Sequence, residues 1–239
     1  MTDSTLCVKA LLFDVFGTVV DWRSSVINEG RDLGRRLGIT VDWESFADAW
    51  RGAYQPSMDP IRTGARAWAN LDTLHRESLV KVLCDFSIEL RDECAIDALN
   101  GVWHRLEPWP DSIAGLQRLK QRYTLGTLSN GNIAMLVNMA KRVGLPWDVV
   151  LGAEIFCTYK PAPQIYLGTC RYLGLAPQEV MLVAAHNNDL FHAKSHGMRT
   201  AFVKRQEEYG TTQTDNLEAE YDFDYVADDF LDLAERLGC

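Results

Sequence analysis

The sequence predicts an α/β protein built on a doubly wound parallel sheet, with a block of helices inserted after the first strand. Short apolar runs typical of buried parallel strands recur along the chain, and helical apolar spacing fills the intervals between the later ones. These runs lie at residues 8–13, 123–128, 149–151, 180–184, 200–203 and 225–227. Such alternation is typical of βαβ units with right-handed crossovers. We expect a core formed by residues 1–21 and 107–239 and a helical cap formed by residues 22–106.

Composition argues against nucleic-acid and membrane partners. The 239 residues carry a formal net charge of −9, which disfavours nucleic acid and anionic membrane surfaces as partners. We expect no membrane segment and a cytoplasmic protein, because no apolar stretch approaches spanning length and no signal-like segment begins the chain. The cysteines are scattered, with no Cys-x-x-Cys pair, which predicts reduced thiols rather than a zinc site or a disulfide framework. They are Cys7, Cys84, Cys94, Cys157, Cys170 and Cys239.

The first apolar run delivers Asp14 to a loop that contains Gly17. An Asp in this position commonly caps a turn. It also stands where open α/β sheets bind ligands, in the crevice at the carboxyl ends of parallel strands. The functional interpretation gains weight because three further polar clusters follow later in the chain.

The inserted block reads as successive amphipathic helices. Apolar side chains recur at helical spacing up to Gly38, again behind the predicted N-cap Asp42, and then from residue 71 to residue 103. Pro56, Pro60 and Gly64 interrupt this pattern and predict a loop. An all-helical insert of this length is typical of a small cap domain.

The three later clusters carry polar groups that also have ordinary structural explanations. Ser129 and Asn130 lie between a strand and a helix, where they suit an N-cap and where free amides bind anions. Lys160 alone would be a solvated surface charge. Asp189 would serve as another N-cap. His192 and His196 have helical metal-ligand spacing, yet no further ligands are evident, so we treat them as surface or packing residues.

The segment Asp14-Val15-Phe16-Gly17-Thr18 resembles the nucleophile motif of the haloacid dehalogenase-like hydrolase superfamily, and Phe16 resembles its type II (L-2-)haloacid dehalogenase branch. Phosphatases of that superfamily carry a second Asp at this place, which protonates the leaving group. Phe16 cannot donate a proton, whereas a halide leaves as a stable anion and needs none. The resemblance therefore implies carbon–halogen rather than phosphoester cleavage.

The resemblance covers the core from residue 8 to about residue 203 and implies a mechanism. Asp14 would attack C2 of a short 2-haloalkanoic acid, expel halide and form an ester, inverting that centre. Water, assisted by Asp189 and Lys160, would release a 2-hydroxyacid, and Thr18 would hydrogen-bond around Asp14. The scheme requires no metal and no cofactor, and its partners are the haloacid and water. A homodimer is usual in the family. A compact pocket rich in hydrogen-bond donors would extend the activity to fluoroacetate, and the sequence permits this.

Substrate-binding roles follow from the same resemblance. Ser129 and nearby backbone amides would hold the substrate carboxylate, while Arg51 and Asn130 would face the halogen. The full predicted set is Phe16, Arg51, Ser129, Asn130, Tyr166 and His186. Part of the branch has Ser-x-Asn where Ala184 and His186 stand here, so an imidazole replaces an amide in the pocket.

Two alternatives stay open. A magnesium-dependent phosphatase of the same superfamily would use Asp14, Ser129, Lys160 and Asp189. A non-catalytic interaction protein that retained the fold would bind a partner without turnover. Halide release in the presence of a chelator, set against magnesium-dependent phosphate release, separates these possibilities from dehalogenation.

Overall fold

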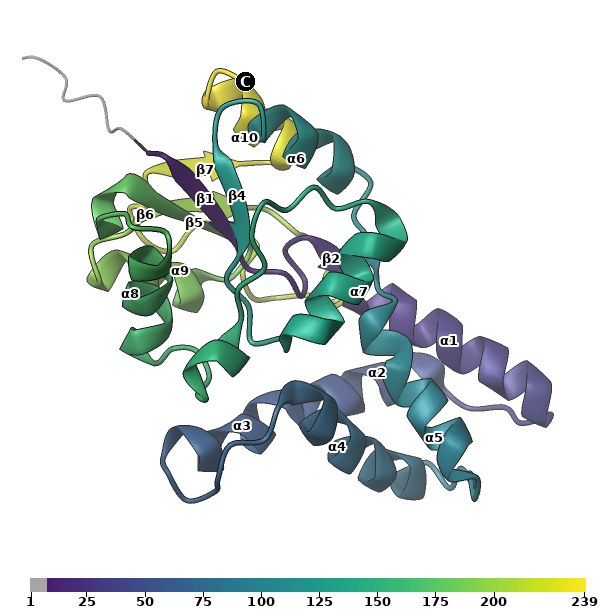
Figure 1. The fold of residues 1–239 in the computed structure, drawn as a ribbon. Coiled ribbons are helices and arrows are strands. Elements are labelled where there is room, and N and C mark those ends of the chain that lie inside the picture. Colours follow the sequence, from purple (N-terminus) through teal and green to yellow (C-terminus); the bar gives the residue numbers. More distant parts are fainter. Residues whose placement is uncertain (1–7) are drawn as a thin grey trace, which may run out of the picture.

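A parallel sheet lies at the centre of the molecule. The computed structural model describes residues 8–239, and within that range a five-stranded sheet has the order β4-β1-β5-β6-β7. Neighbouring strands pair in parallel throughout, which confirms the predicted α/β class (Figure 1). The strands are β1 (Ala10–Phe13), β4 (Thr124–Thr127), β5 (Val180–Ala184), β6 (Arg199–Val203) and β7 (Tyr225–Ala227). Cys7, predicted to be a free thiol, lies outside the described residues.

The central strand β1 brings the polar clusters to one edge. All of its residues are buried, as its continuous apolar run predicts. Its last residue, Phe13, lies level with Thr127 of β4 on one side and with Val183 of β5 on the other. The loops that follow these three strands therefore leave the sheet together, and they carry Asp14, Ser129 and His186 among the predicted site residues.

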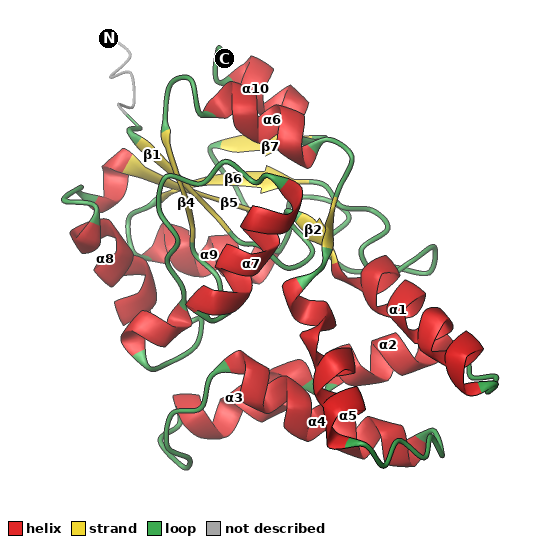
Figure 2. Ribbon diagram, turned by 45° about the vertical axis from the view of Figure 1, so that its right-hand side comes forward, coloured by secondary structure: helices red, strands yellow, loops and turns green. Residues whose placement is uncertain are grey.

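Helices cover both faces of the sheet. Figures 1 and 2 show α6 and α10 together on one side, with α8 and α9 on the other. The core helices are α6 (Ser112–Leu119), α7 (Ile133–Val143), α8 (Pro163–Tyr172), α9 (Asn187–Ser195) and α10 (Phe230–Arg236). Short 3-10 turns are η1 (Gly101–His104), η2 (Ala153–Phe156) and η3 (Pro177–Glu179). Within residues 8–239 no helix has the length and apolar character needed to cross a membrane.

The helical insertion leaves the core through a two-stranded antiparallel ribbon, β2 (Val20–Asp21) paired with β3 (Glu107–Pro108). Its helices are α1 (Trp22–Leu37), α2 (Trp43–Gly52), α3 (Tyr54–Arg62), α4 (Leu71–Asp85) and α5 (Glu93–Asn100). Asp42, the predicted N-cap, accepts the Ser45 N–H at the start of α2, and Asp21 accepts the Ser24 N–H in the same way at the start of α1. In Figures 1 and 2 these helices form a separate layer beside the sheet.

Two local predictions were wrong. The loop predicted around Pro56 and Pro60 is instead the helix α3, because Pro56 falls in its first turn, where an N–H has no partner, while Met58 and Ile61 are buried. Pro60 lies inside the helix, and burial outweighs its lost hydrogen bond. The strand predicted at residues 149–151 is replaced by isolated bridges, such as the one between Gly126 and Val149.

Candidate active site

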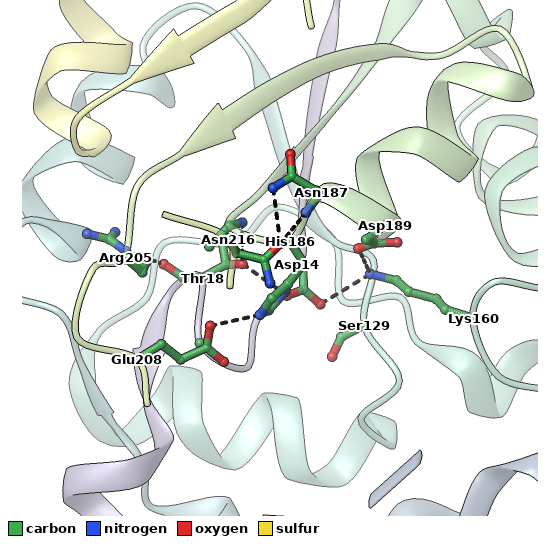
Figure 3. A network of polar contacts seen from close by, with 12 residues as sticks. Asp14, Thr18, Ser129, Lys160, His186, Asn187, Asp189, Arg205, Glu208 and Asn216 are labelled. Carbon is green, nitrogen blue, oxygen red and sulfur yellow. Dashed lines mark hydrogen bonds and ion pairs between the residues drawn. The ribbon is translucent and has the colours of Figure 1, made fainter. Parts of the chain in front are cut away.

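Asp14 lies at the centre of the candidate site, directly after β1. Its Oδ1 accepts a hydrogen bond from Lys160 Nζ at 3.2 Å. Its Oδ2 accepts the Thr18 hydroxyl at 2.9 Å and lies 3.1 Å from His186 Nδ1. Figure 3 shows these side chains converging from the loops after β1 and β5 and from the segment around Lys160. The structure thus brings together groups that are distant in the sequence.

The surroundings of Asp14 keep its carboxylate charged. Burial by itself would raise the pKa of Asp14, but the neighbouring cations Lys160 and His186 and the hydrogen bond from Thr18 hold that pKa well below its ordinary value. A buried carboxylate that stays ionised and retains an oxygen with only one partner is suited to act as a nucleophile.

Lys160 joins Asp14 to a second carboxylate. Its ammonium group lies 2.5 Å from Asp189 Oδ2, and the Tyr166 hydroxyl donates to Asp189 Oδ1 at 2.7 Å. Burial would lower the pKa of Lys160, but the two carboxylates raise it above its ordinary value. Burial and the neighbouring Asp189 also raise the pKa of Tyr166. Asp189 therefore accepts from side chains, rather than capping α9 as the ordinary explanation held.

Arg51, from α2, and Phe16, from the loop after β1, line the same cavity. The guanidinium carbon of Arg51 lies 4.1 Å from the centre of the Tyr54 ring and 5.2 Å from that of Trp22. Its Nη1 atom is buried and has no hydrogen-bond partner within residues 8–239. Phe16 packs edge-on against Tyr54. The aromatic rings hold the guanidinium in place, and its unpaired Nη1 is free to donate to an anion.

A cavity of about 620 Å³ lies between the sheet edge and the cap helices. Most of the predicted site residues line it, namely Asp14, Phe16, Arg51, Asn130, Lys160, Tyr166, His186 and Asp189. Thr18 is fully buried, and its hydroxyl donates a hydrogen bond to Asp14. Lys160, predicted to follow a strand, instead follows the 3-10 turn η2.

Comparisons with known proteins agree with this geometry. Residues 8–197 match the family model of haloacid dehalogenase-like hydrolases. The chain belongs to this family. It is 31% identical to (S)-2-haloacid dehalogenase 4A of Burkholderia cepacia over 86% of each chain.

Two solved structures of this family are similar over nearly the whole chain. One is the L-2-haloacid dehalogenase PA0810, with 50% identity, a TM-score of 0.94 and coverage of 97% of this chain and 99% of the other. The second is the defluorinating L-2-haloacid dehalogenase Rha0230, with 48% identity, a TM-score of 0.96 and coverage of 100% and 99%. The family resemblance predicted from the nucleophile motif is confirmed.

Ser129 lies in the loop after β4, close to Asp14 and Lys160 (Figure 3), and its role in holding the substrate carboxylate stays a prediction. Its side chain is fully buried, its Oγ accepts the Gly131 N–H at 3.1 Å, and it is absent from the cavity wall. Glu154 accepts the Ile133 N–H at 2.9 Å, so this amide at the start of α7 is already paired. Asn130 does line the cavity, and its Oδ1 accepts the Lys160 N–H at 2.8 Å. Ser129 therefore shapes the loop.

His186 also differs from its predicted role. Nδ1 lies 3.1 Å from Asp14 Oδ2, and Nε2 lies 2.8 Å from Glu208 Oε2. Both ring nitrogens are thus occupied by carboxylates, which leaves no N–H for a substrate. The ring lines the cavity by its surface alone.

The sequence reasoning missed the loop after β6. Glu208, Tyr209 and Asn216 come from this loop, and the latter two line the cavity. Glu208 is 1% exposed and bonds His186. This loop lies beyond the matched residues 8–197 and has no strand or helix periodicity, so no local pattern marks these residues. A buried carboxylate such as that of Glu208 can be recognised only from the partners that surround it in the folded chain.

The magnesium alternative fits this donor set poorly. Lys160 engages both Asp14 and Asp189, and the remaining carboxylate oxygens accept from Thr18 and Tyr166. Among the described residues, no cluster of three or more His, Cys, Asp or Glu side chains is arranged to hold a metal ion. The site is instead organised by protein cations.

Proposed function

We propose that this chain hydrolyses short 2-haloalkanoic acids to 2-hydroxyacids through an ester on Asp14. The observation that carries the proposal is the buried Asp14 carboxylate, paired with Lys160 and Thr18 and facing a cavity in which Phe16 replaces a proton donor. The named activities of PA0810, Rha0230 and the Burkholderia enzyme support the same chemistry.

In the first step an Asp14 oxygen attacks C2 in line and the halide leaves as an anion. Arg51 is the buried cation best placed to receive it, because its Nη1 lacks a protein partner. Attack from the side opposite the halogen inverts C2, so an L-2-haloacid would become a D-2-hydroxyacid. The cations Arg51 and Lys160 and the Asn130 amide line the cavity and would orient the substrate carboxylate together with Ser129 and the nearby backbone amides.

In the second step water hydrolyses the ester. Asp189 accepts a proton from water while Lys160 and Tyr166 hold that carboxylate in place. The released acid regenerates the Asp14 carboxylate. Burial of the site limits competing reactions with bulk water.

Fluoroacetate belongs within the proposed substrate range. Fluoride is a poor leaving group and depends on hydrogen bonding to the departing atom. The similarity to the defluorinating Rha0230 supports testing this substrate beside chloroacetate.

Further proposals concern organisation. We propose residues 22–106 as the cap and residues 1–21 and 107–239 as the core because the insertion is all helical, a cytoplasmic location because the cysteines are scattered, and a homodimer on the family resemblance. Equilibrium sedimentation tests the dimer, since a single species of monomer mass at micromolar concentration would contradict it.

The experiment for the activity is halide release from chloroacetate, fluoroacetate and L-2-chloropropionate in the presence of EDTA. The matched variant is Asp14→Asn, with circular dichroism to verify folding. Release by the native protein that the variant loses supports the proposal. Magnesium-dependent release of phosphate from a phosphate ester, without halide release, would instead favour the phosphatase alternative, and binding without any turnover would favour the interaction protein.

A further inference from the structure

His186 is held between two carboxylates that can only accept hydrogen bonds. Asp14 Oδ2 lies 3.1 Å from its Nδ1 and Glu208 Oε2 lies 2.8 Å from its Nε2. An ionised carboxylate has no proton to donate, so both ring nitrogens must carry hydrogen. His186 is therefore an imidazolium that donates to Asp14 on one side and to Glu208 on the other (Figure 3).

Glu208 is fixed in place by the cap and by the nucleophile loop. Its Oε1 accepts the indole N–H of Trp22, the first residue of α1, at 3.0 Å. Its carboxylate lies against Gly17, where a Cβ would overlap it. Gly17 has a φ of +81°, so glycine suits both the backbone turn and the close approach of the Glu208 carboxylate. Glu208 thus aims at His186 from a fully buried position.

The two oxygens of Asp14 have different surroundings. Oδ2 receives two donors, the Thr18 hydroxyl and the His186 imidazolium. Among the described residues, Lys160 alone donates to Oδ1. An oxygen with fewer hydrogen bonds retains a lone pair for attack, whereas one that faces two fixed donors is placed to carry developing negative charge.

We propose that Asp14 Oδ1 becomes the ester oxygen and that His186 and Thr18 form the oxyanion hole for Oδ2 during ester hydrolysis. In this scheme Glu208 is a positioning residue, which keeps the ring protonated and aimed at Oδ2. The inference rests on the function proposed above and assigns roles within its second step.

Ester hydrolysis then proceeds through an oxyanion on Asp14. Water oxygen bonds to Asp14 Cγ, one water proton passes to Asp189, and the π pair of the Cγ–Oδ2 bond moves onto Oδ2. The oxyanion then re-forms the carbonyl and breaks the Cγ–Oδ1 bond. Oδ1 leaves bonded to C2, takes a proton from Lys160 and becomes the hydroxyl group of the product. Asp189 then passes the proton that it received from water to Lys160. The second proton of water is released to solvent, leaving the Asp14 carboxylate.

The electrostatics are consistent with this arrangement. Burial would lower the pKa of His186, but Glu208 and Asp14 raise it well above its ordinary value. Burial would raise the pKa of Glu208, yet His186 and then Arg51 hold it below its ordinary value. Arg51, Lys160 and His186 balance the carboxylates of Asp14, Asp189 and Glu208. An anionic substrate therefore enters a site without net negative charge.

The test is rapid-quench kinetics with chloroacetate, combined with intact-mass analysis of the protein. His186→Leu removes the donor, and we expect it to retain a burst of about one halide per site while ester hydrolysis slows roughly 100-fold or more. Protein carrying one carboxymethyl group should then accumulate. His186→Asn restores a neutral donor and should recover a large part of the lost rate.

Glu208→Gln isolates the positioning role. We expect it to slow ester hydrolysis roughly tenfold in the native background, as outer-shell partners do, and to have no further effect in the His186→Asn background. The exposed neighbour Glu207→Gln is the matched control for Glu208, and His192→Asn on α9 is the control for His186. Both controls should behave like the native protein.

The outcomes separate the two proposals. Loss of the halide burst in folded His186→Leu, or a burst followed by hydrolysis at the native rate, overturns the oxyanion role. An additional loss from Glu208→Gln in the His186→Asn background overturns action through His186. Absence of halide release from the native protein itself would instead reject the proposed function.

Discussion

The buried ion pair of Arg205 and Asp111 contacts the segment that carries Thr18, and its removal should destabilise the protein strongly. Arg205 is 7% exposed and donates to both carboxylate oxygens of Asp111, at 2.8 and 2.9 Å. Its Nε also donates to the Thr18 carbonyl at 2.9 Å. Arg205→Met would leave Asp111 without its cation, although the carboxylate would keep the Phe230 N–H.

Breaking one partner of a buried pair costs about 3–5 kcal/mol, and we expect the lower end because Asp111 retains that backbone donor. For a chain of this size, about 3 kcal/mol lowers the melting temperature by roughly 6–12 °C. Asp111→Asn added to Arg205→Met should recover part of the loss, because it removes the unpaired charge. Chemical and thermal denaturation measure both effects.

The control is Arg236→Met, which breaks an exposed pair of the same residue types with Asp232. Exposed pairs contribute little to stability, so this variant should unfold like the native protein. The Asp111 carboxyl also makes the stabilisation depend on pH. Burial raises its pKa, but Arg205 holds that pKa below the ordinary value, so the stabilisation is present above about pH 4 and is lost as pH falls further. Equal midpoints for Arg205→Met and Arg236→Met would refute the reasoning.

Three further predictions concern the site. Tyr166→Phe removes a charge-assisted hydrogen bond to Asp189, so ester hydrolysis should slow about tenfold while the halide burst persists; a smaller burst would contradict this. Arg51→Lys keeps the charge but loses the planar stacking and the fork of donors, and kcat/KM for chloroacetate should fall about tenfold, whereas an unchanged value would remove Arg51 from the halide role. Glu208→Gln removes the largest contribution that raises the pKa of His186, so the ring loses its proton at lower pH and the alkaline fall in kcat should shift to lower pH. Superimposable pH profiles of the variant and the native protein would contradict the role of a protonated His186. The groups facing the ring in this test are Asp14 and Glu208, with Lys160 and Arg51 as the nearby cations.

The sequence alone determined the fold class and much of the site. Parallel strands and amphipathic helices leave local periodicities, and Asp14, Lys160 and Asp189 occupy segments that resemble family motifs. Because the carboxyl ends of parallel strands meet at one edge, the order of strands and clusters along the chain is enough to predict that Asp14 and Asp189 converge.

The tertiary structure decided what these residues touch. Glu208 reaches Trp22 across 186 positions of the chain, and nothing near it in the sequence marks a buried carboxylate. The hydrogen bond from the Gly131 N–H to Ser129 Oγ and the helix through Pro60 likewise depend on packing and hydrogen bonding in the folded chain. Local sequence sets periodicity and turn chemistry, whereas the burial and pairing of a charge are properties of surroundings that only folding assembles.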